Sequence, residues 1–338
     1  MTDLAALVPK QETEAAIASL RAEGIHDESR RLVEHGESVA IPIIEPPTST
    51  RVRDVIEQVD PEPRAPGLPA LLEERGFSPA EIEAAPGSWA VIGDVILVRF
   101  GDCERREAVA DALLELHRGA DTVLARKGIA GEHREPDVEV VAGSGDTETV
   151  HTEHGTEYGL DLAEVMFSPG NKAERVRMGE IVGPDEQVLD MFAGIGYFAL
   201  PMARAGAQVT AVERNPVAFQ YLSENARRND VTDRVALVLG DCREVVSVRA
   251  DAGVTYDRVV MGHYDAHEYL DQAMAAVAPG GIVHLHEAAP DALLWDRPVA
   301  HLETAASGAD RTVSSIERRR VKTHSEGVTH VVLDATVE

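Results

Sequence analysis

The fold of this chain is decided by the stretch Val188-Leu189-Asp190-Met191-Phe192-Ala193-Gly194-Ile195-Gly196. Its first half is an apolar run typical of a buried strand, and its second half is a glycine-rich turn before helical periodicity that begins at Tyr197. Glycines allow the backbone to approach a ligand where a side chain would collide with it. The stretch is neither G-x-G-x-x-G nor a P-loop, so a dinucleotide or a nucleoside triphosphate is disfavoured as the ligand.

Strands and helices alternate on both sides of this stretch. Strands are expected at 187–192, 208–213, 235–239, 258–261 and 281–286, helices at 197–205, 216–229 and 266–278, and two closing strands at 312–318 and 328–334. Alternation of this kind predicts βαβ units and a mostly parallel sheet. The fold class is therefore α/β, with a Rossmann-like domain over residues 161–338.

Smaller α+β domains are expected before this domain. Residues 86–160 are expected to form a middle domain, with two strands around Gly93-Asp94, a helix at 107–118 and a hairpin turning at His154-Gly155. Residues 1–46 are expected to form a small domain with one helix through Ala16 and Leu20. The proline-rich range 47–85 is interpreted as a linker with a short helical patch near Leu68.

The form D-x-F-A-G-x-G resembles motif I of class I methyltransferases. That resemblance implies S-adenosylmethionine as the bound cofactor, in its role as group donor. Glu213 ends the second strand, where a carboxylate can accept both ribose hydroxyls, and Asp241 follows the third, where it can accept from the adenine amino group. Glu213 and Asp241 could each instead be a solvent-facing acid at the end of a strand. The glycine-rich turn could likewise be an ordinary strand-to-helix turn without a ligand. Together they indicate one site, because ligands bind at the carboxyl edge of such a sheet.

A second segment, Phe167-Ser168-Pro169-Gly170-Asn171-Lys172-Ala173-Glu174-Arg175, resembles the F-S-P-x-x-x-x-E-R segment of archaeal enzymes that modify purine 37 of tRNA. Residues 92–95 and 320–334 are also similar to that superfamily. It contains tRNA (guanine37-N1)-methyltransferases and wybutosine-pathway 3-amino-3-carboxypropyltransferases. After the fourth strand the methyltransferases have Asn-Pro-Pro, whereas this chain has Met261-Gly262-His263-Tyr264, which resembles the aminocarboxypropyl branch.

The resemblance implies transfer of the 3-amino-3-carboxypropyl group to 4-demethylwyosine at position 37 of tRNA-Phe. Two alternatives are a tRNA (guanine37-N1)-methyltransferase and a non-catalytic tRNA-binding protein on the same fold. The catalytic candidates are Glu174 and His263, although a helix-terminal role for Glu174 and a loop-lining role for His263 remain open. No metal is expected, and no role is assigned to His284 or His286. The implied cofactor-binding residues are Ser168, Arg175, Asp190, Phe192, Ala193, Gly194, Gly196, Glu213, Arg214, Asp241, Cys242 and Met261.

The net charge of the chain affects whether a nucleic acid can be its partner. The chain has 59 acidic and 32 basic residues for a net charge of −27, and its lysines are Lys10, Lys127, Lys172 and Lys322. An acidic, lysine-poor composition resembles that of proteins from organisms with molar cytoplasmic salt. There the Debye length falls to about 3 Å, so net charge does not exclude tRNA. The expected phosphate contacts are Arg175, Arg177, Arg318, Arg319 and Arg320.

The remaining expectations concern location and assembly. No stretch approaches 18 uncharged apolar residues and the first residues are acidic, so neither a membrane span nor a signal peptide is expected. Cys103 and Cys242 are interpreted as free thiols in a reducing compartment. A cytoplasmic location is therefore expected, and the protein is also expected to be a monomer.

Overall fold

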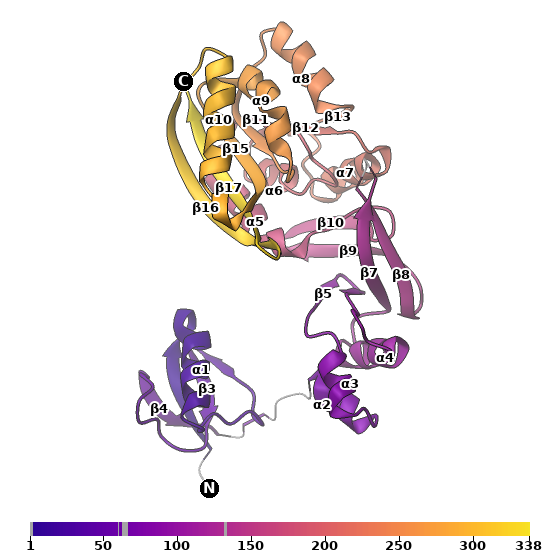
Figure 1. Cartoon of the computed structure of the whole chain (residues 1–338), viewed down its shortest axis with the longest axis vertical. Coiled ribbons are helices and arrows are strands. Elements are labelled where there is room, and N and C mark those ends of the chain that lie inside the picture. The colour runs from indigo at the N-terminus through magenta and orange to yellow at the C-terminus, as the bar shows by residue number, and fades with distance from the viewer. Residues whose placement is uncertain (1–2, 60, 63–66, 132–133) are drawn as a thin grey trace. The chain divides into compact units, whose positions relative to one another are not determined.

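The computed structural model describes residues 3–59, 61–62, 67–131 and 134–338 (Figure 1). The chain divides into two compact units, Met1–Ile82 and Glu83–Glu338. Of the expected domains, residues 1–2 of the first, 60 and 63–66 of the linker and 132–133 of the middle domain lie outside the described residues. Among the described residues, no helix has the length and apolar character that crossing a membrane requires.

The N-terminal unit contains an antiparallel sheet in the order β2-β3-β1-β4. The expected helix is present as α1, and its Ala16 and Leu20 are buried in one cluster with Ile41 and Ile43. The expected linker is wrong at Asp54–Glu57, because these residues pair with the first strand as β4. The elements are β1 (Leu4–Pro9), η1 (Lys10–Glu12), α1 (Thr13–Ala22), β2 (Val33–His35), β3 (Ser38–Ile43), β4 and α2 (Leu68–Glu74), with α3 (Pro79–Ala84) at the boundary between the units.

The second unit begins with a four-stranded sheet in the order β5-β6-β7-β8 and a separate hairpin, β9-β10. The hairpin turns where expected, since His154 and Gly155 have φ of 47° and 78°, the left-handed values of a tight hairpin turn. The elements are β5 (Trp89–Ile92), β6 (Val95–Val98), α4 (Arg106–Leu116), β7 (Thr122–Ala130), β8 (Glu135–Gly143), β9 (Glu148–Glu153) and β10 (Thr156–Asp161).

A seven-stranded sheet in the order β13-β12-β11-β14-β15-β17-β16 follows. The first five strands in this order are parallel, and β17 and β16 close the sheet antiparallel. The strands are β11 (Gln187–Asp190), β12 (Gln208–Glu213), β13 (Val235–Leu239), β14 (Tyr256–Met261), β15 (Val277–Pro290), β16 (Val313–Ser325) and β17 (Val328–Val337). The predicted α/β, Rossmann-like class is confirmed.

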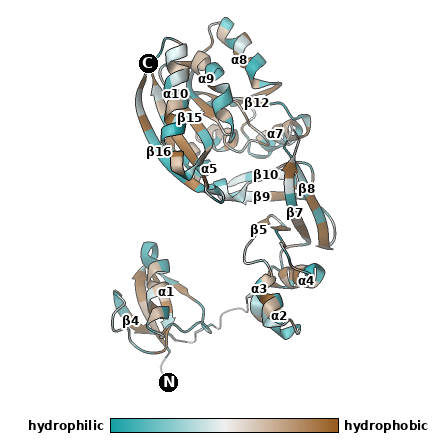
Figure 2. Ribbon diagram, in the orientation of Figure 1, coloured by the Kyte–Doolittle hydropathy of each residue, from teal (hydrophilic) through white to brown (hydrophobic). Residues whose placement is uncertain are grey.

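Helices cover both faces of this sheet. α6 and α7 pack with Val188 and Val209 on one face, and α8, α9 and α10 pack with Leu189 and Val212 on the other. Figure 2 shows hydrophobic colouring along the strands and hydrophilic colouring on α8. The helical elements are η2 (Pro169–Asn171), α5 (Lys172–Ile181), α6 (Ala199–Arg204), α7 (Pro216–Arg228), α8 (Cys242–Asp251), η3 (Ala266–Tyr269), α9 (Leu270–Ala276), η4 (Asp291–Leu293) and α10 (Asp296–Gly308).

Candidate active site

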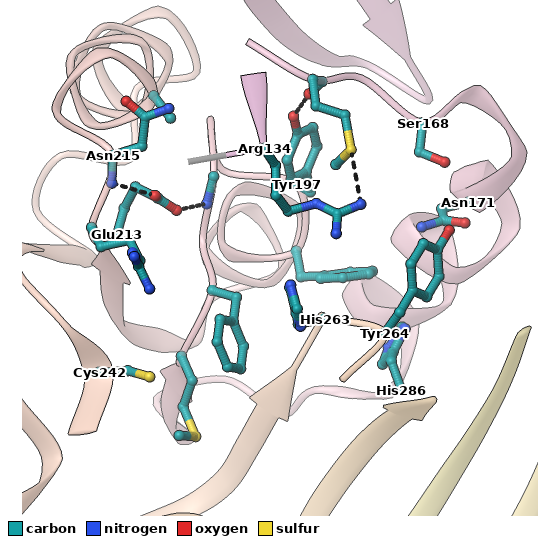
Figure 3. A pocket seen from close by; sticks show the side chains of 18 of the residues that line it. Arg134, Ser168, Asn171, Tyr197, Glu213, Asn215, Cys242, His263, Tyr264 and His286 are labelled. Atoms are coloured by element: carbon teal, nitrogen blue, oxygen red, sulfur yellow. Dashed lines mark hydrogen bonds between the residues drawn. The ribbon is translucent and has the colours of Figure 1, made fainter. Parts of the chain in front are cut away.

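A pocket lies over the carboxyl ends of β11, β12, β13 and β14, at the sheet edge that the sequence predicts (Figure 3). The predicted residues that line it are Ser168, Arg175, Phe192, Gly194, Glu213, Arg214, Asp241, Cys242 and His263. The predicted residues that do not line it are Glu174, Asp190, Ala193, Gly196 and Met261. One half of the pocket, around Glu213 and Asp241, is called the nucleoside half below, and the other, around Tyr264 and His286, the acceptor half.

Glu213 at the end of β12 anchors the nucleoside half. Its carboxylate accepts from the backbone N–H groups of Gly194 and Asn215, each at 2.7 Å (Figure 3). Burial raises the pKa of Glu213, although these backbone hydrogen bonds oppose the shift. A carboxylate has about four lone-pair sites, so two bonded N–H groups leave capacity for a ligand's diol.

The glycine-rich turn fixes the backbone next to Glu213. Gly194 has φ of +56°, and a Cβ at this position would lie 2.3 Å from Cε2 of Tyr197. A side chain is therefore excluded both by the backbone conformation and by the neighbouring ring.

Asp241 and Cys242 close the far end of the nucleoside half. Oδ1 of Asp241 accepts from the N–H of Arg243 at 2.9 Å and caps α8, and both oxygens also pair with the Arg243 guanidinium, at 3.0 and 2.6 Å. The hydrogen bond from Arg243 lowers the pKa of Asp241. Arg243 is half exposed, so this pair is weak enough for a ligand's amino group to compete for the carboxylate. Burial, with Asp241, raises the pKa of Cys242 to about 12, so it stays a thiol.

Asp190 ends β11 and is not among the residues that line the pocket, so its predicted contact with the cofactor stays a prediction. It is fully buried, and its Oδ1 accepts from the N–H of Phe192 at 3.2 Å. Burial raises its pKa to about 7. Ala193, Gly196 and Met261 are likewise not among the residues that line the pocket. Ala193 and Met261 are fully buried in the hydrophobic clusters, and a Cβ at Gly196 would meet Leu200. Ala193 and Gly196 belong to the turn itself, whereas Met261 is the last residue of β14.

Arg175 lines the pocket, but the edge of its guanidinium that could bind a carboxylate through two hydrogen bonds is already bonded. Its Nε and Nη2 donate to the two carboxylate oxygens of Glu153 at 2.7 and 2.9 Å, and its Nη1 donates to the carbonyl of Ser168 at 3.0 Å. The predicted bidentate pair with a cofactor carboxylate is therefore made with Glu153 instead. Ser168 lines the pocket as predicted, and its hydroxyl accepts from Lys322 at 2.7 Å.

Glu174, a predicted catalytic residue, is not among the residues that line the pocket. Its Oε1 accepts from Nε of Arg319 at 2.9 Å, and the side chain is 7% exposed. The side chain therefore joins α5 to β16, in line with the structural alternative. His263, the other candidate, does line the pocket and stacks on Phe192 at 5.3 Å between ring centroids. Burial, with Arg134, lowers the pKa of His263, so its ring is neutral.

The five arginines predicted as phosphate contacts do not form one free patch. Arg175 is bound to Glu153, Arg177 lies 2.5 Å from Asp334, and Arg319 binds both Glu174 and Asp334. Arg318 and Arg320 are exposed and show no ion pair within the described part of the chain. Only these two of the five are thus placed to meet a phosphate without first breaking an ion pair.

Several pocket residues carry no prediction from the sequence. Tyr264 is in the segment that separates the two branches, but His286 and His330 come from β15 and β17 and meet only in the folded sheet. In the sequence, each appears as a histidine within an apolar strand. A buried histidine with a purely structural role gives the same pattern, so the sequence does not mark these two as site residues. The unpredicted residues with polar side chains are Arg134, Asn171, Tyr197, Asn215, Tyr264, Tyr269, His286 and His330.

A histidine–carboxylate group outside the pocket has an explanation without a metal. Donor atoms of His267, Glu287 and His301 lie within 4.8 Å of one another. Glu287 is fully buried, and its two oxygens are bonded to Arg297 at 2.7 Å and to His301 at 3.0 Å. These bonds compensate the buried charge, so the group carries no metal assignment.

The parallel sheet, the glycine-rich turn and the carboxylate at the end of β12 define a class I, S-adenosylmethionine-dependent transferase. Residues 149–314 match the family described as the TRM5/TYW2 methyltransferase domain, and residues 70–147 match the TYW2 N-terminal domain. The chain belongs to this TRM5/TYW2 family.

Individual relatives agree with this family. The chain is 38% identical over 260 residues to a tRNA(Phe) (4-demethylwyosine(37)-C(7)) aminocarboxypropyltransferase of Pyrococcus horikoshii, across 76% of this chain and 91% of that protein. The structure of P. horikoshii TYW2 in complex with MeSAdo matches with a TM-score of 0.67 and 33% identity, across 80% of this chain and 98% of that one. Trm5b of Pyrococcus abyssi matches with a TM-score of 0.73 and 28% identity across all of both chains.

Proposed function

We propose that this chain transfers the 3-amino-3-carboxypropyl group of S-adenosylmethionine to 4-demethylwyosine at position 37 of tRNA-Phe. When bound, S-adenosylmethionine supplies three electrophilic carbons on one sulfonium, and the carbon aligned with the nucleophile is the one transferred. The choice of product is therefore a matter of positioning by the pocket walls.

The segment after β14 carries this proposal. A Cβ at Gly262 would lie 2.7 Å from Cε2 of Phe198, so the backbone there packs against the pocket wall and tolerates no side chain. His263 and Tyr264 follow directly, and both line the pocket. The segment thus occupies the position at which the methyltransferase branch has Asn-Pro-Pro. The aminocarboxypropyltransferase of P. horikoshii, similar over 260 residues, supports the same choice.

Methylation of guanine 37 is the rival function, and one observation favours it. Trm5b of P. abyssi aligns with 99% of this chain, whereas the P. horikoshii aminocarboxypropyltransferase aligns with 76%. This difference in coverage says how much of the chain aligns with each relative. It gives no information on the residues that line the pocket. We therefore keep the segment at Met261–Tyr264 as the stronger argument.

We also propose the assembly and the roles of the smaller domains. The protein acts as a cytoplasmic monomer, and its N-terminal unit, which extends past residue 46 to include β4, precedes the middle domain at 86–160 and the catalytic domain at 161–338. The N-terminal domain is proposed to contact tRNA at a distance from nucleotide 37. Size-exclusion chromatography with light scattering tests the monomer, and tRNA affinity after removal of the whole N-terminal unit, residues 1–82, tests the contact.

Product analysis tests the activity itself. The protein is incubated in high salt with S-adenosylmethionine and tRNA-Phe that carries either guanosine or 4-demethylwyosine at position 37. Mass spectrometry of the digested tRNA is expected to show an added aminocarboxypropyl group on the tricyclic base, with release of methylthioadenosine. A methyl group on guanosine, with release of S-adenosylhomocysteine, would overturn the proposal in favour of its rival. No product with either tRNA would favour a non-catalytic binding protein.

A further inference from the structure

The acceptor half of the pocket contains two buried histidines that are bonded to each other. His286 and His330 are 1% and 0% exposed, and Nδ1 of His286 lies 3.1 Å from Nε2 of His330. Both side chains line the pocket, and His286 lies beside Tyr264 in Figure 3. Among the described residues, neither Nε2 of His286 nor Nδ1 of His330 has a hydrogen-bond partner. Buried polar atoms are normally bonded, so two unbonded nitrogens on residues that line the pocket point to a ligand as the missing partner.

The internal hydrogen bond determines what this imidazole pair offers to a ligand. A neutral imidazole has one N–H and one lone pair. If His286 donates to His330, the outer nitrogen of His286 is an acceptor and the outer nitrogen of His330 is a donor. The opposite arrangement exchanges these two roles. The pair therefore always presents one donor and one unprotonated acceptor.

Burial keeps the imidazole pair neutral. Burial, followed by Lys322 and His324, lowers the pKa of His330 to about 3. Burial, followed by His330 and His284, lowers the pKa of His286 well below its ordinary value. Asp334 raises this pKa by a smaller amount, and Arg319 lowers it further. An unprotonated nitrogen is therefore available through the neutral and mildly acidic range.

We propose that the imidazole pair contacts the acceptor base and takes up the proton that its reacting carbon loses. The inference rests on the proposed aminocarboxypropyl transfer. A ring electron pair forms the new bond from the acceptor carbon to Cγ, while the bond from Cγ to sulfur breaks and the sulfur keeps its electron pair. The acceptor carbon then holds a hydrogen on a cationic ring. The free lone pair of the imidazole pair removes this hydrogen as a proton, which restores the aromatic ring, and the proton passes to solvent after product leaves.

A weak base is sufficient for this step. A carbon that carries hydrogen on a cationic ring is a strong acid, so the base must above all be unprotonated and in contact. The other candidates fit less well. Glu174 is bound to Arg319 and does not line the pocket, and burial raises the pKa of Tyr264, which keeps the phenol protonated. His263 lines the pocket, but its ring stacks on Phe192 and its Nδ1 already accepts from the N–H of Asp265.

Two substitutions remove one outer nitrogen each and retain the internal bond. His286→Asn keeps an atom near Nδ1 but lacks Nε2, and His330→Gln keeps an atom near Nε2 but lacks Nδ1. Each variant is tested for methylthioadenosine affinity by calorimetry, for thermal unfolding, and for single-turnover rate. The rate is measured on tRNA with hydrogen or deuterium at the acceptor carbon. At least one variant is expected to lose about 10²-fold in rate, the size of a general-base contribution, with unchanged methylthioadenosine affinity.

The isotope effect separates a proton acceptor from a structural histidine. Deuterium is expected to slow the affected variant further, because proton removal becomes rate-limiting, and to have no effect on the wild type. His284→Gln is the matched control, since His284 is a buried histidine on the same strand whose two nitrogens are bonded to Arg258 and Asp334. It is expected to lower stability without an isotope effect.

Two results would overturn the inference alone. One is normal wild-type product with unchanged rates and no isotope effect in both variants. The other is an isotope effect that arises in His263→Gln instead. Wild-type enzyme that forms no aminocarboxypropyl product would overturn the proposed function, and this inference with it.

Discussion

Arg175 and Glu153 form two parallel hydrogen bonds, Nε to Oε2 at 2.7 Å and Nη2 to Oε1 at 2.9 Å. The guanidinium also lies 4.8 Å from the centre of the Phe167 ring. The pair joins β9 to α5 and holds the segment that begins at Phe167 against the hairpin. Both side chains are almost fully buried, so neither charge has water as an alternative partner.

Removing one member of this pair should be costly. Glu153→Ala leaves the Arg175 guanidinium buried without its counter-ion and is expected to lower the free energy of unfolding by about 3–5 kcal/mol. The double substitution Glu153→Leu with Arg175→Met should cost less than Glu153→Ala alone, because no charge is left unpaired. Urea unfolding in high salt measures both values. A double variant no more stable than the single one would contradict the argument.

The same pair predicts a dependence of stability on pH. Burial raises the pKa of Glu153, but hydrogen bonds from His151 and Arg175 outweigh it and lower the pKa from 4.5 to about 2. A lowered folded-state pKa contributes stability that is complete above about pH 5 and is lost as the pH falls toward 2. The wild type should therefore lose more stability between pH 6 and pH 3 than the Glu153→Leu, Arg175→Met variant, as urea unfolding at the two pH values would show.

Glu213 should control cofactor affinity. Glu213→Gln replaces one carboxylate oxygen with an NH2 group, which cannot accept the hydrogen bond from the backbone N–H that faces it, and it removes the charge expected to bind the ribose hydroxyls. Hydrogen bonds to charged groups contribute about 1.5–3 kcal/mol, so methylthioadenosine should bind roughly 10- to 100-fold more weakly. Calorimetry measures the affinity. Glu244→Gln, an exposed acid on α8, is the control, and an equal loss in both variants would contradict a specific role.

Gly194 should tolerate no side chain. Gly194→Ala strains a left-handed backbone and also places a Cβ 2.3 Å from the Tyr197 ring. Gly101 has nearly the same φ, +55°, and a Cβ there would have no neighbour within 4 Å, so Gly101→Ala isolates the backbone term of about 1–2 kcal/mol. Gly194→Ala should destabilise more than this control and should abolish methylthioadenosine binding, as thermal unfolding and calorimetry would show. Equal unfolding temperatures would mean that the ring moves freely aside.

Local sequence patterns predicted the part of the site that is built locally. The turn at Gly194 and the acids at Glu213 and Asp241 each follow directly from a strand, so their positions depend on residues nearby in sequence. The helix α8 was not expected, because Val245, Val246 and Val248 are β-branched and weak helix formers. Packing of Val246 against the sheet overrides that local preference.

Two side chains that were predicted to act in the site are bonded to partners far away in the sequence. Arg175 was expected to bind a ligand, but its partner Glu153 lies 22 positions away, and Glu174 is held by Arg319 from 145 positions away. His286 and His330 meet across 44 positions. The pairing of whole strands determines which counter-ion lies next to each charged group. A single sequence does not specify which distant residues come together in this way.

Glu174 should behave as a structural residue. Glu174→Gln removes the charge that faces Arg319, which is expected to lower the unfolding temperature while the transfer rate and its dependence on pH stay close to wild type. Single-turnover rates between pH 5 and pH 9 measure this. Loss of the acidic limb of the pH–rate profile in the variant would show instead that Glu174 accepts a proton.

Salt should stabilise this protein by screening its own charge. The net charge of −27 repels itself in the compact state, and the Debye length falls from about 10 Å at 0.1 M salt to about 3 Å at 1 M. The unfolding temperature should therefore rise by several degrees between dilute buffer and molar potassium chloride. Sucrose is the control, because it strengthens burial without screening charge. A smaller rise in sucrose than in salt would assign the effect to electrostatics, whereas no rise in salt would show that the acidic surface is already compensated.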